Sequence, residues 1–140
     1  MKRRLSRECA FKALFMIDQG HNNQEGALNY VLENSGLPAK EQAYCVGLVK
    51  GVTNKEKELD QILTGFLVNW EFSRLAATVR SILRLSLYEI IYDDNIPPVV
   101  SINEAIELAK IYQGEDAARF VNGILDKIRK SDIKGDPGKL

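Results

Sequence analysis

Basic and aromatic side chains gather at the start of the chain, and their types and spacing suit a binding surface. Arg4 and Arg7 lead at helical spacing to Phe11 and Phe15. Cations neutralise phosphates while nucleobases stack on aromatic or guanidinium planes, so this combination is typical of proteins that hold single-stranded RNA. The alternative is that both phenylalanines belong to the core. Further basic residues nearby are Lys2, Arg3 and Lys12.

The same pairing of a cation with a ring recurs near the other end of the chain. Arg119 and Phe120 stand next to Asn122 and Gly123. Asn and Gly are poor residues for a helix interior, so their position predicts close helix packing or a hydrogen bond that offsets the propensity cost. The alternative is that Phe120 is buried and Asn122 caps a neighbouring backbone.

The residues that catalysis or metal binding would need are sparse. His21 is the one histidine, and it stands in a polar link without an HExxH motif. Cys9 and Cys45 lie among apolar neighbours, which would raise the pKa of a thiol and which favours buried, reduced cysteines in a cytoplasmic protein. No phosphate-binding glycine motif and no apolar run of about 20 residues is present. We expect no enzyme activity, no catalytic residue, no metal, no cofactor and no membrane span.

Charge is divided along the chain although the formal net charge is zero. Residues 1–12 contain five basic side chains and one acidic side chain, whereas residues 85–116 contain seven acidic side chains and one lysine. This distribution suggests one surface for an anion and another for a cationic partner.

Arg80 and Arg84 stand one helical turn apart in a segment that is otherwise almost wholly apolar. Like charges at that spacing repel, so both arginines need carboxylate partners. Glu89 in the same segment, or Glu104 and Glu107 in the next, are the candidates. A surface for a partner protein is the alternative.

The elements that must position these residues are helical, because the strongest apolar periodicities are helical and no convincing strand pattern is present. The expected helices cover residues 5–19, 24–34, 39–52, a segment ending near 65, 73–92, 102–113 and 115–130. Apolar residues around most of the fifth segment predict a central helix. Thr53 with Glu56, and Ser101 with Glu104, have the spacing of capping boxes that would open the fourth and sixth helices.

We expect one compact all-α domain of about seven helices at residues 1–130, because the links are short and no repeat divides the chain. Residues 131–140 are mostly Gly, Pro, Lys and Asp, which predicts a disordered tail. Gly47 and Gly51 would let another helix backbone approach the third helix. The apolar helix faces could build either a monomer core or a homodimer.

Four segments resemble the NusB family in their order and spacing. They are RRLSRECAFKALF at 3–15, ILRLSLYEI at 82–90, INEAIELAK at 102–110 and FVNGILDKI at 120–128. The resemblance implies an all-helical transcription antitermination factor. Such a factor binds boxA-type RNA of ribosomal RNA leader transcripts together with NusE, a ribosomal small-subunit protein, and helps RNA polymerase to pass terminators.

The resemblance also implies where RNA and the partner would bind. The arginine-rich opening corresponds to Arg3, Arg4 and Arg7 of this chain, and Phe15 falls where some relatives have a tyrosine. The expected RNA-binding residues are Lys2, Arg3, Arg4, Arg7, Phe15, Arg119 and Phe120.

Acidic residues at the start of the last expected helix are the candidates for the protein partner. Glu115 and Asp116 lie where the family meets NusE and RNA, and the acidic run ahead of them fits a basic ribosomal protein. The alternative function is a protein interaction or dimerisation module without RNA contact.

Overall fold

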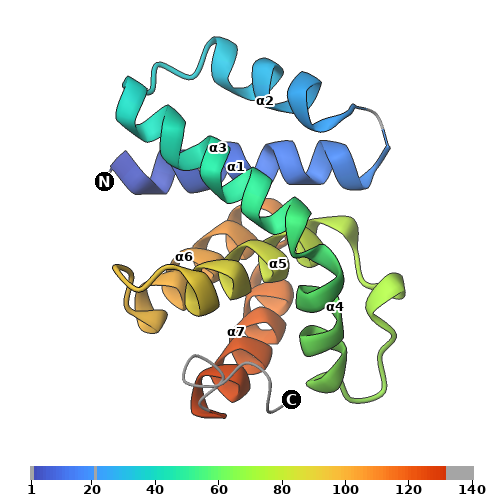
Figure 1. The fold of residues 1–140 in the computed structure, drawn as a ribbon. Helices are drawn as coiled ribbons and strands as arrows, with labels where there is room; N and C mark the ends of the chain where they lie inside the picture. Colours follow the sequence, from blue (N-terminus) through green and yellow to red (C-terminus); the bar gives the residue numbers. More distant parts are fainter. Residues whose placement is uncertain (1, 21, 132–140) are drawn as a thin grey trace.

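The computed structural model describes residues 2–20 and 22–131, and these form seven α-helices and one short 3-10 helix, η1 (Figure 1). The elements are α1 (Lys2–Asp18), α2 (Gln24–Glu33), α3 (Ala39–Asn54), α4 (Glu56–Gly65), η1 (Phe72–Arg74), α5 (Ala77–Tyr92), α6 (Pro98–Gln113) and α7 (Glu115–Lys130). No strand occurs in these residues. The prediction of an all-α fold with about seven helices is confirmed. His21 and all of the expected tail except Ser131 lie outside the described residues.

The central helix is α5, as the apolar pattern of its segment predicts. Eleven of its 16 residues are buried. It contacts α1 and α3 on one side and α4, α6 and α7 on the others, so these five helices surround it (Figure 1). It begins at Ala77, later than expected, because residues 72–74 form η1 instead. Through α5, the helices from the two ends of the chain share one hydrophobic core.

The capping box expected at Thr53 is wrong. The hydroxyl of Thr53 donates to the backbone carbonyl of Val49, 2.8 Å away, within α3, which continues to Asn54. The N-cap of α4 is Lys55, which makes no side-chain capping bond. A threonine inside a helix commonly donates to the carbonyl four residues earlier, and this bond takes the hydroxyl that capping would need.

The capping box expected at Ser101 is also wrong, because α6 begins earlier than 102. Pro98 is in the first turn of α6, where a proline is well tolerated since its missing amide hydrogen would be unsatisfied there anyway. Ser101 is therefore buried inside α6, and its hydroxyl donates to Glu89 at 3.1 Å. Pro97 is the N-cap of α6 and Pro98 its first residue, so the prolines of this link begin the next helix.

The glycines within the helices differ in how closely other parts of the protein approach them. The ring of Tyr88 occupies the space beside Gly51, so any side chain at residue 51 would collide with it. Gly51 does make room for a close neighbour, but that neighbour is a tyrosine ring and not the helix backbone that was expected. At Gly47 and Gly123, no atom of another element lies within 4 Å of the position that a β-carbon would occupy, so the close packing expected at Gly47 is wrong, as is the close-packing alternative at Gly123. Asn122 is exposed.

Candidate nucleic-acid interface

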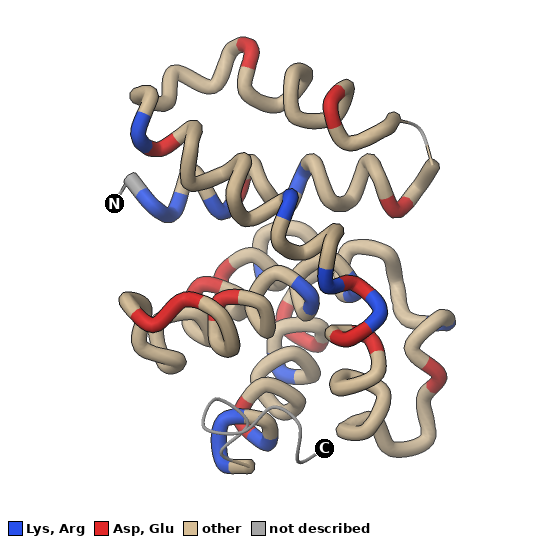
Figure 2. The backbone as a smooth tube through the Cα atoms, in the orientation of Figure 1, with Lys and Arg blue, Asp and Glu red and all other residues tan. Residues whose placement is uncertain are grey.

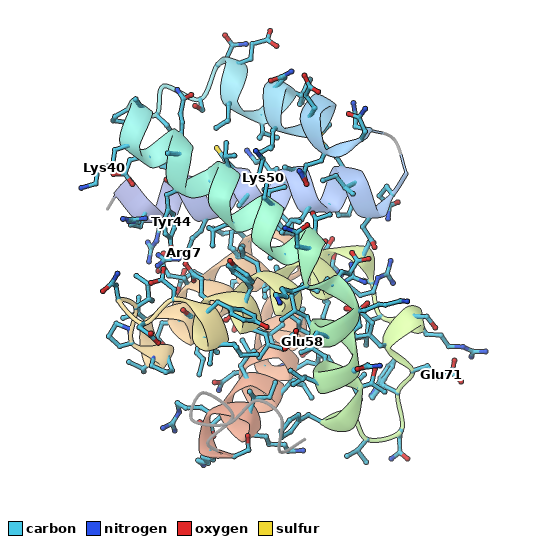
Figure 3. The ribbon with its side chains drawn as sticks, in the orientation of Figure 1. Arg7, Lys40, Tyr44, Lys50, Glu58 and Glu71 are labelled. Atoms are coloured by element: carbon cyan, nitrogen blue, oxygen red, sulfur yellow. The ribbon has the colours of Figure 1, made fainter. Side chains whose placement is uncertain are left out.

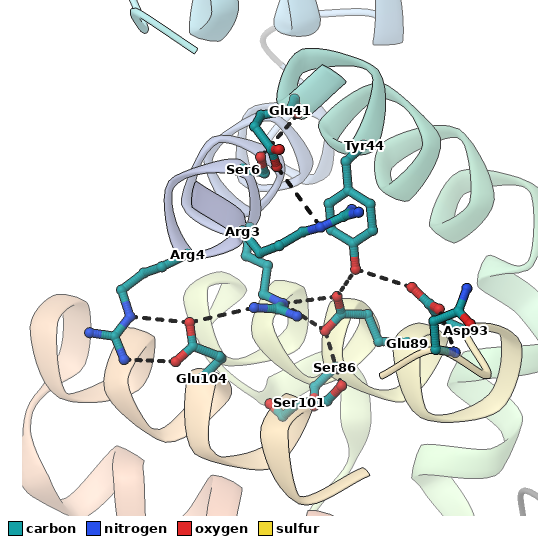
Figure 4. A network of polar contacts seen from close by, with 12 residues as sticks. Arg3, Arg4, Ser6, Glu41, Tyr44, Ser86, Glu89, Asp93, Ser101 and Glu104 are labelled. Carbon is teal, nitrogen blue, oxygen red and sulfur yellow. Dashed lines mark hydrogen bonds and ion pairs between the residues drawn. The ribbon is translucent and has the colours of Figure 1, made fainter. Parts of the chain in front are cut away.

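Arg4 is an exposed cation that α6 holds in place. Its side chain is 59% exposed, and its Nε and Nη2 donate to the two carboxylate oxygens of Glu104 at 3.1 and 2.7 Å (Figure 4). This two-point bond raises the pKa of Arg4 and lowers the pKa of Glu104. The planar guanidinium is thereby oriented at the surface, where it can still meet an anion.

Arg3 is half-buried and faces α3 rather than α6. Its guanidinium carbon lies 3.6 Å from the centre of the Tyr44 ring, and its Nε lies 3.9 Å from a carboxylate oxygen of the buried Glu41 (Figure 4). Stacking on an aromatic face is a favourable position for arginine. The side chain of Lys2, the other basic residue of this opening, lies outside the described part of the chain.

Arg7 is not at the surface, which corrects the expectation that it binds phosphate. Its side chain is 4% exposed, and its Nε donates to both oxygens of Glu89 at 3.0 and 2.9 Å. Glu104 lies 3.6 Å from Arg7 Nη1. Figure 3 shows Arg7 and Tyr44 close together where α1 and α3 approach α5. Arg7 is a structural cation, because the buried carboxylate of Glu89 requires a positive partner.

Glu89 is the centre of a buried polar network that joins four helices. Besides Arg7 of α1, it accepts hydrogen bonds from the hydroxyls of Tyr44 in α3 and Ser101 in α6 (Figure 4). Burial and the bond to Glu89 raise the pKa of Tyr44. Every partner is supplied by a different helix, so this network fixes the start of α1 relative to α3, α5 and α6.

The two phenylalanines of α1 have different environments. Phe11 is 3% exposed and belongs to the core, whereas Phe15 is only half-buried. The ring of Tyr112, in the last turn of α6, packs on Phe11 at 4.8 Å between centres, and its hydroxyl donates to Glu8 at 2.6 Å. Phe15 therefore stays available at the surface, beside the end of α6.

The second cation-and-ring pair lies in the first turns of α7. Arg119 is 70% exposed and donates to Asp116, three residues earlier, which is 97% exposed. Phe120 is half-buried, and its ring meets the edge of Trp70 at 6.1 Å between centres. Trp70 is 57% exposed. Trp70 was not among the residues predicted to bind, although a tryptophan in a link between helices is a signal of a contact surface.

Helix α6 connects the two groups of candidate residues. Its Glu104 binds Arg4, its Tyr112 packs on α1, and its end leads through Gly114 directly into α7. Gly114 makes this sharp connection at a φ of 100°, in the left-handed region that favours glycine. Arg4 thus lies against α6, and Arg119 lies in the helix that follows α6 directly; the ion pair that each arginine forms does not join the two.

The acidic segment is divided between carboxylates that pair with basic side chains of the fold and an exposed group at the start of α7. Figure 2 shows acidic residues of α6 beside the basic start of α1. At least four of the seven acids at 85–116 form ion pairs with a basic side chain, among them Glu89, Glu104, Glu107 and Asp116. Glu89 and Glu104 thus neutralise basic side chains at the start of α1, whereas Glu115 and Asp116 remain exposed.

Arg80 and Arg84 have the carboxylate partners that their spacing requires, but not the expected ones. Asp18 at the end of α1 binds Arg80 at 2.7 Å and Arg84 at 3.1 Å. Asp60 of α4 binds Arg84 through two bonds of 2.7 and 2.9 Å. Arg80 and Arg84 face the end of α1 and α4, which supply their partners. The expected partner Glu104 instead binds Arg4, near the start of α1.

The described residues contain no group of His, Cys, Asp and Glu that could hold a metal ion. Burial raises the pKa of both free thiols, that of Cys45 to about 12, so neither cysteine is an activated nucleophile at neutral pH. None of the helices described is long and apolar enough to cross a membrane.

Comparison with known proteins gives a consistent family. The sequence profile of the NusB family matches residues 4–130. The chain is 46% identical to the transcription antitermination protein NusB of Bacillus velezensis, over 96% of this chain and 99% of that protein. It is 44% identical to the protein of the same name from Bacillus subtilis, over 96% and 98%.

Solved structures show the same fold. NusB of T. maritima superposes with a TM-score of 0.87 at 33% identity, covering 99% of this chain and 97% of that one. A NusB crystallised with NusE and double-stranded RNA superposes with a TM-score of 0.86 at 28% identity, covering 93% and 97%. The chain therefore belongs to the NusB family of transcription antitermination proteins.

Proposed function

We propose that this protein binds boxA-type RNA together with the ribosomal protein NusE, without catalysing a reaction, and acts in the cytoplasm within the antitermination complex of RNA polymerase on ribosomal RNA operons. The observation that carries the proposal is the exposed guanidinium of Arg4, held at the surface by Glu104. A relative that has been crystallised with NusE and RNA supports it.

The RNA surface that we propose follows α1, α6 and the start of α7. Arg4 uses Nε and Nη2 for Glu104, which leaves Nη1 for a phosphate oxygen. Arg119 supplies a second exposed cation, and Phe15 and Phe120 supply rings on which bases can stack. Arg3 and Lys2 extend the charge at the start of α1, while Arg7 supports this surface from within.

The start of α7 is the surface that we propose for NusE. Glu115 and Asp116 are exposed there, and a basic ribosomal protein would complement their charge. Trp70, exposed beside Phe120, adds an apolar centre of the kind that protein interfaces use.

Replacing Arg4 with alanine tests the RNA surface. We expect the slope of log affinity against log salt concentration to become shallower by about 0.7, the value for one phosphate contact on single-stranded RNA. Affinity at low salt should fall about tenfold. The measurement is fluorescence anisotropy of a labelled boxA-type RNA, with and without NusE, over a series of salt concentrations.

The matched control is Arg129→Ala, which removes an exposed arginine that pairs with Asp126 near the far end of α7. This variant should keep the slope of the parent protein. Equal slopes for the parent and Arg4→Ala would mean that Arg4 contacts no phosphate. That result would favour a protein interaction module without RNA contact.

Asp116→Asn should strengthen RNA binding. Asp116 places a negative charge on the proposed RNA surface and engages Arg119. Its neutral substitute would release that guanidinium for phosphate, and because exposed ion pairs are weak, the gain should be about two- to fivefold. The control is Asp126→Asn, which breaks an Arg–Asp pair of the same spacing farther along α7. Unchanged RNA affinity together with weaker NusE binding would assign Asp116 to the protein partner alone.

A further inference from the structure

A hollow of about 290 Å³ opens beside Phe15, between helices that lie far apart in the sequence. Lys12, Phe15 and Met16 come from α1 and Tyr30 comes from α2. Thr78 in the first turn of α5 and Tyr112 in the last turn of α6 also line it.

Aromatic rings form much of this wall. Tyr30 is 70% exposed, Tyr112 is 36% exposed and Phe15 is half-buried. Behind them, the buried Phe11 packs on Tyr112 and on Phe15, with ring centres 4.8 and 6.4 Å apart. The bond from the Tyr112 hydroxyl to Glu8 fixes that ring. The rings are thus backed by the core, as a stacking platform for a planar group requires.

We infer that this hollow is a pocket for a single unstacked nucleobase of the bound RNA. The inference rests on the proposed function and assigns to it a subsite that includes Tyr30, Lys12 and Thr78 as well as Phe15. The base stacks against the rings, and the hydroxyl of Thr78 provides a donor and acceptor for the base edge.

Charge favours a nucleotide as the occupant. Lys12 is exposed and is the one charged side chain among the described residues that line the hollow. It can neutralise the phosphate attached to the bound base. The neighbouring hollow, between α1 and α2, is lined by Glu8 and Glu33 as well as Lys12. Its carboxylates would repel phosphates, so we expect the RNA backbone not to run through it.

Size also favours a nucleobase. Ligand pockets commonly measure about 300–1,000 Å³, so this hollow is at the lower limit and suits one base with part of its ribose. A helix of a partner protein needs a longer groove for side chains on successive turns. Along α1, Phe15 lies roughly 16 Å from Arg4 at 1.5 Å per residue, so a short stretch of RNA can reach both.

The test uses a series of RNAs, each lacking one base of the same boxA-type sequence while keeping its phosphates. For the parent protein, loss of the pocketed base should weaken binding by about 5- to 100-fold, the usual range for one stacked base. In Tyr30→Ala, intact RNA should bind correspondingly more weakly, and removal of that same base should cost less than about threefold, because the stacking contact is already lost. The loss of affinity for each base removed, plotted along the RNA, gives a profile for each variant. In Phe15→Leu, the loss at the same position should also be smaller than in the parent.

The control is Tyr92→Ala, which removes a 38% exposed tyrosine that lines a different hollow, between α3 and α5. Its profile should match that of the parent. Thermal unfolding of each variant checks the fold, and Tyr30 is exposed enough that its loss should be tolerated.

Three results would overturn the pocket. In the first, the parent binds intact RNA but removal of no single base weakens its affinity. In the second, Tyr30→Ala keeps the full loss at every position. In the third, Tyr30→Ala weakens NusE binding measured in the absence of RNA and leaves the base-removal profile unchanged. The occupant of the hollow would then be a side chain of the partner protein. If the parent binds no RNA at low salt, with or without NusE, the proposed function fails as well, which separates that failure from the other three.

Discussion

Arg7→Ala is expected to lower the free energy of unfolding by about 3–5 kcal/mol, the range for breaking a buried ion pair by removing one partner. Arg7 is 4% exposed and Glu89 is 1% exposed, so the substitution leaves a carboxylate in the interior without its cation. Urea denaturation of the variant and the parent measures this loss.

The same variant separates structural arginines from RNA-binding ones. At a temperature where Arg7→Ala remains folded, the salt dependence of its RNA affinity should equal that of the parent, because Arg7 reaches no phosphate. Arg4→Ala should show the opposite pattern, with little change in stability and a shallower salt dependence. A normal unfolding transition together with a shallower slope for Arg7→Ala would contradict the buried role assigned to Arg7.

A double variant tests the cause of the instability. In Arg7→Met with Glu89→Gln, the interior no longer holds a lone charge. The hydroxyls of Tyr44 and Ser101 donate to different oxygens of Glu89, so the glutamine oxygen can accept from one of them while its amide NH2 can donate to the oxygen of the other. Replacing both charges of a buried pair by neutral groups is often nearly neutral for stability. The double variant should therefore be more stable than Arg7→Ala. An equal or larger loss would assign the effect to packing rather than to the uncompensated charge.

The position of Arg7 could have been predicted more closely from the sequence than it was. Arg7 lies three and four residues before Ala10 and Phe11, which are both buried, so it belongs to the apolar stripe of α1. Lys12 is exposed on another face of the helix, whereas Arg4 lies two turns before Phe11 on the same stripe and is exposed because it is in the first turn of α1. The sequence shows this periodicity, but its count of basic residues treats all of the arginines alike.

The partners of the buried charges could not be predicted in the same way. Glu89 is 82 residues from Arg7, and Asp60 is 24 residues from Arg84. Such pairs depend on how the helices are oriented around α5, which apolar periodicity alone does not determine. Helix existence and type, by contrast, follow from local patterns, and the glycine at 114 marks the end of α6 correctly.

The two capping boxes were wrong for a physical reason that also applies elsewhere. Thr and Ser can donate to a backbone or side-chain acceptor inside a helix, so a Thr or Ser three residues before a Glu does not by itself mark a helix start. Thr53 donates within α3, and Ser101 donates to Glu89. In the second case the residue that was expected to cap a helix belongs to the network that holds Arg7.

Both ends of α1 are attached to α5 by ion pairs. Arg7 and Glu89 join them near the start of α1, while Asp18 joins its end to Arg80 and Arg84. The helix that carries Arg4, Lys12 and Phe15 is thus held at two places along its length. Rigid placement of binding groups reduces the ordering cost when a ligand binds.

Arg84→Ala should lower the free energy of unfolding by about 2–3 kcal/mol, less than Arg7→Ala because its partners are nearer the solvent. Its side chain is 10% exposed, whereas those of Asp18 and Asp60 are 14% and 29% exposed. The substitution also removes the guanidinium that lies 5.1 Å from the centre of the Phe72 ring. Urea denaturation measures the loss, which should persist at high salt because partly buried pairs are screened less than exposed ones.

Two further variants make this prediction specific. Arg84→Lys keeps the charge but cannot make the two parallel bonds to Asp60, so it should recover only part of the lost stability. Arg129→Ala removes an arginine from an exposed pair and should change stability by no more than about 0.5 kcal/mol. If Arg84→Ala were as mild as Arg129→Ala, Arg84 would contribute nothing measurable to the cluster, and Arg80 alone would hold Asp18 at the end of α1.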